Sequence, residues 1–136
     1  MIDFQYIKTK QFNRKNTKAW LKKVISNEEK SLGEIVYIFC QDEYLLQKNI
    51  TFLNHNTLTD VISFDYSNGN IISGDIFISI ERVSENAKKF KTEFLTELDR
   101  VMVHGLLHLL GYKDKQNTDS ELMKKKEDYY LSLRWY

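Results

Sequence analysis

The chain of 136 residues contains no proline, one cysteine and only five glycines. The single cysteine, Cys40, excludes an intramolecular disulfide and a metal site built from cysteines alone, and it fits a reducing, cytoplasmic setting. No apolar run approaches the roughly 18 residues that a membrane-spanning helix needs. The N-terminal segment lacks the apolar core of a signal peptide. Because proline is missing, the breaks between elements must be inferred from asparagine, aspartate, serine, threonine and the few glycines.

The composition is typical of a globular protein, with 42% hydrophobic and 29% charged residues. The length predicts one domain over residues 1–136. A formal net charge of +1 excludes a strongly basic or acidic tail. The charge is nevertheless uneven, because residues 1–30 carry eight basic and three acidic side chains. This basic end is either a solvated helix face or a surface that contacts phosphates.

Apolar periodicity predicts strands and helices that alternate at first and helices alone afterwards. Strands are expected at residues 1–7, 34–40, 61–64 and 71–80, the last interrupted at Gly74, and an Asn-Gly turn between the last two predicts a hairpin. Helices are expected at residues 14–27, 42–53, 81–91, 93–110 and 119–134, with caps at Asn13, Thr92 and Thr118. The expected fold class is α+β, with helices packed on a sheet.

One segment of the fourth predicted helix carries side chains that bind metals. The run HGLLHLLGYKD extends from His104 to Asp114, and the four-residue spacing of its histidines stacks both imidazoles on one helix face. Two ring nitrogens can then reach one ion at roughly 2.0–2.1 Å. Gly111 permits a left-handed turn that lets Asp114 return its carboxylate as a third ligand. The spacing equals that of the metzincin zinc proteases, and three protein ligands leave a position open for water, as in catalytic zinc sites.

Other interpretations of this helix need weighing. The helix is apolar nearly all round, so the histidines could be core residues, although a buried imidazole pair without partners is costly. Peptide hydrolysis is disfavoured, because Gly105 stands where H-E-x-x-H proteases carry their general base. Glu97 lies on the same face as His104, seven residues earlier, and either supports the ligands or is an ordinary solvated glutamate.

Two upstream blocks accompany the histidine run. The segment TDVISF begins at Thr59 and the segment GDIFIS begins at Gly74. These segments are similar to the T-[DN]-V-L-S-F and G-D-I-x-I-S blocks of the YbeY family of bacterial endoribonucleases and ribosomal RNA maturation factors. The run from His104 to Asp114 is similar to the family motif H-G-x-L-H-L-x-G-Y-D-H. The order and separation of the three blocks agree over about residues 40–130.

The resemblance implies a small α+β fold with a mixed sheet and a zincin-like helix. It implies one zinc ion in a cleft, with His104, His108 and Asp114 as metal ligands and catalytic residues. It further implies cleavage of single-stranded RNA, with the ribosome or its small subunit as partner, in 16S rRNA maturation and ribosome quality control in the cytoplasm. Ser63 and Asp75 lie in the matched blocks and are expected to shape the cleft.

Two positions depart from the family pattern. The third ligand of the family is usually histidine, whereas Asp114 is a carboxylate, which also binds zinc but lowers the charge of the site and the acidity of a bound water. An arginine that the family carries six residues before the TDV block is replaced by Leu53. Lys48, Lys113 or another basic residue would have to take its place, or the stabilisation of transition-state charge is weaker. Tyr112, beside the site, either stacks on a base or packs.

Two functions of other classes remain open on the sequence. Two histidines and one carboxylate also describe the iron site of non-haem oxygenases, although that site is normally built on a β-barrel. A ribosome-assembly factor with a structural metal would carry the same ligands without cleaving RNA. Iron at unit occupancy in a metal analysis under anaerobic conditions would favour the first alternative. Ribosome binding without metal-dependent cleavage would favour the second.

Overall fold

The structure is a computed structural model that describes residues 1–11 and 14–136. The strands are β1 (Ile2–Tyr6), β2 (Ser31–Cys40), β3 (Val61–Asp65) and β4 (Ile71–Ser79). The helices are α1 (Lys15–Asn27), α2 (Asp42–Leu53), α3 (Ile80–Lys89), α4 (Phe94–Leu109) and α5 (Asn117–Ser132). The predicted order of strands and helices is confirmed. The predicted cap Asn13 lies outside the described residues.

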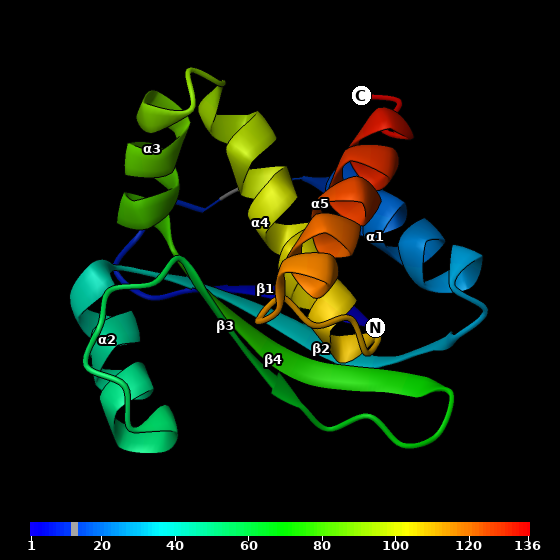
Figure 1. Cartoon of the computed structure of the whole chain (residues 1–136), viewed down its shortest axis with the longest axis horizontal. Helices are drawn as coiled ribbons and strands as arrows, with labels where there is room; N and C mark the ends of the chain where they lie inside the picture. Colours follow the sequence, from blue (N-terminus) through cyan, green and yellow to red (C-terminus); the bar gives the residue numbers. More distant parts are fainter. Residues whose placement is uncertain (12–13) are drawn as a thin grey trace.

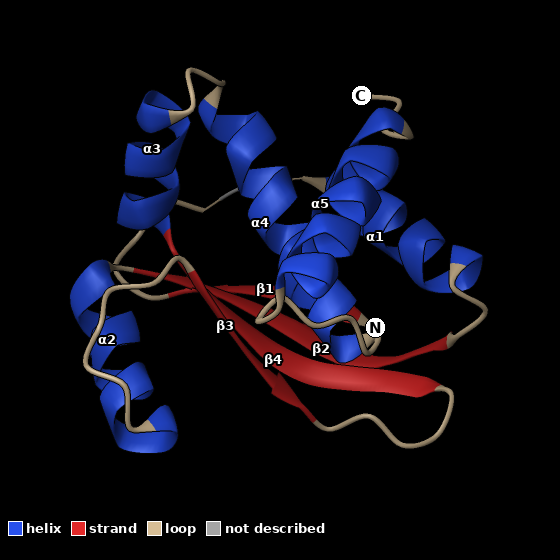
Figure 2. Cartoon of the chain, viewed as in Figure 1, coloured by secondary structure: helices blue, strands red, loops and turns tan. Residues whose placement is uncertain are grey.

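The four strands form one mixed sheet in the order β1-β2-β4-β3 (Figure 2). β2 runs parallel to both β1 and β4, while β3 pairs antiparallel with β4, as the predicted hairpin requires. The hairpin turn contains Gly69 at φ +60°, a conformation that glycine adopts without steric cost. The α+β fold class with a small mixed sheet is therefore confirmed.

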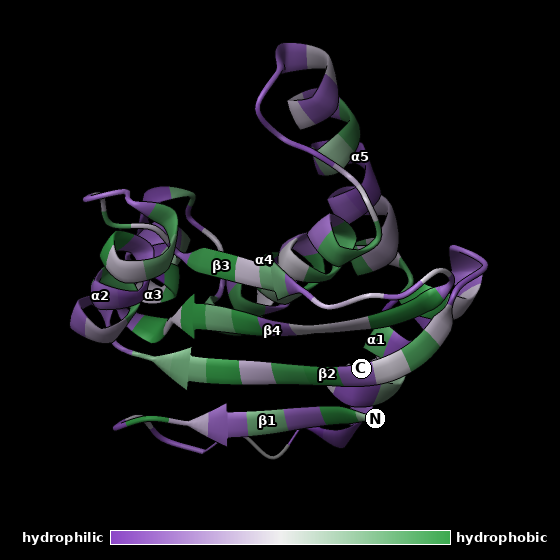
Figure 3. Cartoon of the chain, turned by 90° about the horizontal axis from the view of Figure 1, so that it is seen from below, coloured by the Kyte–Doolittle hydropathy of each residue, from purple (hydrophilic) through white to green (hydrophobic). Residues whose placement is uncertain are grey.

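Helices cover the two faces of the sheet unequally. Helices α1, α3, α4 and α5 lie on one face, and α2 lies on the other (Figure 1). The larger core lies beneath the four helices, and the smaller core, around Leu45, lies beneath α2. Figure 3 shows the strands side by side from below, with α2 at one end of the sheet. No helix within the described residues is long and apolar enough to cross a membrane.

Strand β4 is continuous, so the predicted interruption at Gly74 is wrong. The glycine permits close packing instead: a Cβ there would lie 2.4 Å from the Phe64 carbonyl oxygen and 2.9 Å from the Leu109 side chain. The absence of a side chain thus lets the end of α4 rest directly on the sheet. A glycine inside a strand pattern marks close approach here, not a break.

Two predicted caps are also wrong. Helix α4 begins after Glu93, and the backbone N–H of Thr92 donates to the carbonyl of Ala87 at the end of α3. Helix α5 begins at Asn117, after Gln116, so Thr118 lies inside its first turn. Neither helix start has a side-chain capping hydrogen bond. Because most of the stability of a helix in a protein comes from the packing of its apolar face, a good cap residue alone does not determine where the helix begins.

A buried carboxylate ties both ends of the chain to α4. Asp99 is fully buried and accepts hydrogen bonds from Arg14 and Arg134, each with a shortest N–O distance of 2.8 Å. The hydroxyl of Tyr136 donates to the same carboxylate at 3.1 Å. Arg14 precedes α1, and the other two partners follow α5. This arrangement holds the helices that flank α4 in place, since a buried charge requires its partners.

Candidate metal centre

Two histidines of α4 face one another across a single helical turn. The ring centroids of His104 and His108 are 4.7 Å apart, and their Nε2 atoms are 3.1 Å apart. Both side chains are half-buried, at 22% and 29% exposed. They lie at the rim of the core rather than within it, so the interpretation as core residues does not hold.

The chain reversal after α4 delivers the carboxylate. Gly111 adopts φ +102°, and the backbone N–H of Tyr112 donates to the carbonyl of Leu107, which closes the helix end. The reversal brings Asp114 Oδ2 to 3.2 Å from His104 Nε2 and 3.3 Å from His108 Nε2. The three predicted site residues are therefore together in space.

The geometry of these three atoms fits a tetrahedral metal ion. Ligands at roughly 2.0–2.1 Å from a tetrahedral ion are separated from one another by about 3.3 Å. The three separations here, from 3.1 to 3.3 Å, have that size. Neutral imidazole nitrogens and a carboxylate oxygen are ligands that zinc accepts. The residues thus fit a metal with a fourth position directed away from the protein ligands.

His104 is held by a residue that the sequence analysis missed. Its Nδ1 lies 2.7 Å from Oε2 of Glu127 on α5. The other carboxylate oxygen, Oε1, accepts a hydrogen bond of 3.0 Å from Arg100, whose guanidinium also donates to Asp128 at 2.7 Å. Because the carboxylate accepts from Nδ1–H, it leaves the Nε2 lone pair for a metal. One signal was available: Glu127 occupies a position of the buried stripe of α5 between Met123 and Tyr130.

His108 is oriented by the backbone. Its Nδ1 lies 3.0 Å from the carbonyl oxygen of Tyr112, which again leaves Nε2 for a metal. The Tyr112 hydroxyl donates to Glu28 at 2.6 Å, and Lys126 and the Tyr130 hydroxyl bind the same carboxylate. Of the two predicted roles of Tyr112, packing is the one that its contacts support.

Acidic groups surround His104 on its buried side. Burial lowers the pKa of His104, but the hydrogen bond and charge of Glu127, with Asp60 and Asp114, raise it overall. Burial raises the pKa of Asp60, against the nearby charge of His104. Glu97 is 4% exposed, and burial together with neighbouring carboxylates raises its pKa despite Arg100. The interpretation of Glu97 as a solvated glutamate is therefore wrong.

A cavity of about 530 Å³ opens over the three ligand atoms. It lies between α4, β3 and the loop that follows α2. Leu53 lines it and is 42% exposed, which agrees with its predicted place at the end of a helix beside a polar loop. Besides the three candidate ligands, its lining contains Lys115, His55 and two carboxylates, Asp60 and Asp65. Lys48 lies instead over three aromatic rings in a different cavity, so it does not replace the family arginine.

Gly105 explains how α4 approaches the sheet beside the site. A Cβ at this position would lie 2.7 Å from the Ile76 side chain and 3.2 Å from Ser63 Oγ. The Ser63 hydroxyl donates to the Gly105 carbonyl at 3.1 Å. Ser63 also lines the cavity, as predicted, and Asp75 is not among the residues that line it. A glutamate after His104 would point into the sheet, so the general base of H-E-x-x-H proteases has no room here.

Comparison with known proteins gives consistent matches over nearly the whole chain. A family model described as endoribonuclease YbeY matches residues 3–133. The chain is 55% identical to the endoribonuclease YbeY of Flavobacterium johnsoniae, over 98% of this chain and 96% of the relative. It is 62% identical to that of Flavobacterium psychrophilum, over 84% of this chain and 81% of the relative. The solution structure of TM1509 from Thermotoga maritima matches with a TM-score of 0.72 and 26% identity, over 99% and 89% of the two chains.

Proposed function

Because the chain belongs to the endoribonuclease YbeY family, we propose that it is a metal-dependent endoribonuclease that cleaves single-stranded RNA. The catalytic site consists of His104, His108 and Asp114, which hold one zinc ion. The observation that carries the proposal is the triangle of their ligand atoms, with sides of 3.1 to 3.3 Å, at the base of an open cavity. A site with three protein ligands beside an open cavity is typical of catalytic zinc.

The protein side chains prepare this site for phosphodiester hydrolysis. A zinc ion supplies Lewis acidity, which lowers the pKa of water and polarises a phosphoryl oxygen. Glu127 and the Tyr112 carbonyl hold both histidines with Nε2 facing the cleft. Lys115 lines the same cleft and can bind the phosphate backbone. Leu53 occupies the position of the family arginine and cannot bind a phosphate. Lys115 therefore supplies the positive charge of the cleft instead.

The biological setting follows from the family resemblance. We propose that the whole chain acts as one metal-dependent hydrolase domain in the cytoplasm, with ribosomal RNA of the small subunit as substrate. Its role there is 16S rRNA maturation and ribosome quality control. The alternative of an assembly factor with a structural metal predicts binding to the small subunit without cleavage. The iron-site alternative loses support, because both histidines lie on one helix of an α+β fold.

The test is cleavage of end-labelled single-stranded and duplex RNA by the purified protein. We expect cleavage of the single strand only, loss of activity with a chelator, and recovery when zinc is restored. His108→Ala should abolish both cleavage and bound zinc, because two ligands hold the ion poorly. Chelator-resistant cleavage, or equal cleavage by His108→Ala, would refute the proposal. Elemental analysis of protein purified without oxygen distinguishes zinc from iron.

A further inference from the structure

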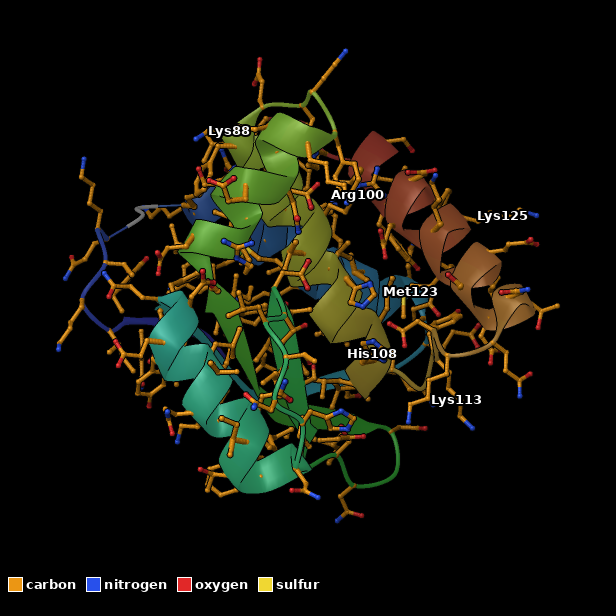
Figure 4. The ribbon with its side chains drawn as sticks, turned by 60° about the vertical axis from the view of Figure 1, so that its left-hand side comes forward. Lys88, Arg100, His108, Lys113, Met123 and Lys125 are labelled. Atoms are coloured by element: carbon orange, nitrogen blue, oxygen red, sulfur yellow. The ribbon has the colours of Figure 1, made fainter. Side chains whose placement is uncertain are left out.

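A second cavity of about 510 Å³ meets the first at the metal centre. His104 and Asp114 line both cavities. The second cavity is a groove between α4 and α5, and it leads away from the ligands toward the start of α4. In Figure 4, Arg100 and His108 lie on α4, Met123 lies beside them on α5, and Lys88 lies beyond Arg100 on α3. A chain bound at the metal could therefore continue into the groove.

Regular spacing along both helices forms the walls of this groove. Thr96, Arg100 and His104 follow one another at four-residue intervals on α4, and Ser120 and Lys124 do so on α5. At 1.5 Å per residue, the wall from Thr96 to His104 is about 12 Å long. That length accommodates about two to four nucleotides, since stacked nucleotides are spaced by roughly 3.4 Å.

An aromatic side chain surrounded by lysines stands at the far end. Phe90 lines the groove and is 60% exposed, so the face of its ring is accessible to a ligand. Lys88, Lys89 and Lys91 flank it in the sequence, and the Lys89 ammonium lies 5.6 Å from the centre of its ring. An exposed aromatic ring among cations is the combination that binds single-stranded nucleic acid, by stacking on a base and contacting phosphates.

The charges of the groove favour a polyanion. Three carboxylates line it: Glu97 and Glu127 are buried, with Glu127 in an ion pair with Arg100, and Asp114 belongs to the metal centre. Lys124 is exposed on the opposite wall. Away from the metal centre, the accessible charge is therefore that of Lys124 in the lining and of the lysines beside Phe90 at the far end, which is positive.

We propose that this groove binds the substrate strand on one side of the scissile bond, with Phe90 stacking on a base and Lys124 contacting a phosphate. The inference rests on the proposed function, because it assigns a path to the RNA that the metal centre cleaves. It adds a binding surface remote from the ligands, formed by the α3–α4 connection and by α5. The groove should raise affinity for strands long enough to reach Phe90 and leave shorter ones unaffected.

The test compares two pairs of variants. Phe90→Ala is matched by Tyr129→Ala, which removes another exposed aromatic ring outside the groove. Lys124→Gln is matched by Lys125→Gln, the neighbouring exposed lysine that does not line the groove. Binding is measured by fluorescence anisotropy with chelator present, using labelled single strands of about 12 and about 4 nucleotides. KM and kcat are then measured for the zinc-loaded proteins, together with zinc content.

For the longer strand, Phe90→Ala should weaken binding by about 5- to 160-fold, the range for loss of one base–aromatic stack. Lys124→Gln should reduce the slope of log affinity against log salt by about 0.7. KM should rise with little change in kcat or zinc content, and the control variants should behave as wild type. Wild-type binding by both groove variants, or equal losses in the controls, would overturn the proposal. If wild type never cleaves RNA while the groove variants still lose binding, the groove stands and the proposed activity fails.

Discussion

Replacing Glu127 by glutamine should weaken zinc binding without removing a ligand. The carboxylate accepts from His104 Nδ1 at 2.7 Å and is itself held by Arg100 at 3.0 Å. The amide keeps the size of the side chain but loses the charge that favours Nδ1–H on the imidazole. Outer hydrogen-bond partners of this kind typically contribute 10- to 100-fold to metal affinity. We therefore expect the zinc dissociation constant to rise by about that factor, or about 1.4 to 2.7 kcal/mol.

The assay is a competition titration with a zinc indicator, and its pH matters. Glu127 helps to raise the pKa of His104, so at low pH a proton competes with the metal more strongly in wild type than in the variant. That competition hides part of the effect, and the full loss should appear only at pH well above the ordinary value of 6.5. Nitrogen chemical shifts of His104 in the metal-free variant should show a larger share of the tautomer protonated at Nε2.

Asp128→Asn is the matched control for this experiment. Asp128 is the neighbour of Glu127, carries the same charge and binds the same Arg100 at 2.7 Å. It contacts Arg100, whereas within the described part of the chain the side chain of His104 bonds to Glu127 and to the other residues of the metal centre. Zinc affinity should therefore stay near the wild-type value. Equal losses in both variants would show that net charge, not the contact with His104, is responsible, and no loss in Glu127→Gln would refute the reasoning.

Four further changes have defined outcomes. Asp114→Ala should weaken zinc binding strongly, and Asp114→His should restore it, because imidazole is also a zinc ligand. The same titration measures both affinities, and unchanged affinity in Asp114→Ala would reject the three-ligand site. Leu53→Arg should alter the free energy of unfolding by no more than about 0.5 kcal/mol, since the residue is exposed, and should increase cleavage by adding a cation to the cleft; a large loss in urea denaturation would contradict this. Asp99→Asn should lower the free energy of unfolding by roughly 3 kcal/mol, because it leaves Arg14 and Arg134 without their buried partner; a near-neutral result would count against the network. Burial alone would raise the pKa of Glu28, but the Tyr112 and Tyr130 hydroxyls and Lys126 lower it overall. The contribution of Glu28 to stability is therefore present above pH 4.5 and is lost as the pH falls. In urea denaturation, the free energy of unfolding of Glu28→Gln should differ from that of wild type at neutral pH and converge with it in acid.

Features that depend on neighbours in the sequence could be predicted from it. The paired spacing of His104 and His108, the glycine turn at Gly111 and the hairpin at Gly69 all arise within a few residues. Their geometry follows from helix and turn dihedral angles, which the local sequence largely determines. The three ordered blocks likewise identified the family before any coordinates. These local patterns were sufficient to predict that His104, His108 and Asp114 lie together.

Helix starts were predicted less well, because they do not depend only on residues that are neighbours in the sequence. A threonine at position 92 or 118 is a good cap in isolation, but several neighbouring residues can serve at a modest difference in free energy. The packing of α4 on the sheet and of α5 on α4 outweighs that difference. Gly74 shows the same limit: its sequence pattern is compatible with a break or with close approach, and only the position of Leu109 decides between them.

The sequence by itself determined the fold class and the family, and it predicted the three residues of the candidate metal centre. Only the tertiary structure decided what supports and surrounds the ligands. Glu127 follows His104 by 23 residues, and Glu28 precedes Tyr112 by 84, so these contacts exist only once α1 and α5 have packed beside α4. The groove that ends at Phe90 likewise arises between two helices whose relative position no local pattern records. Local patterns specify which atoms can bind a metal, whereas packing at long sequence separation fixes their orientation, charge and access.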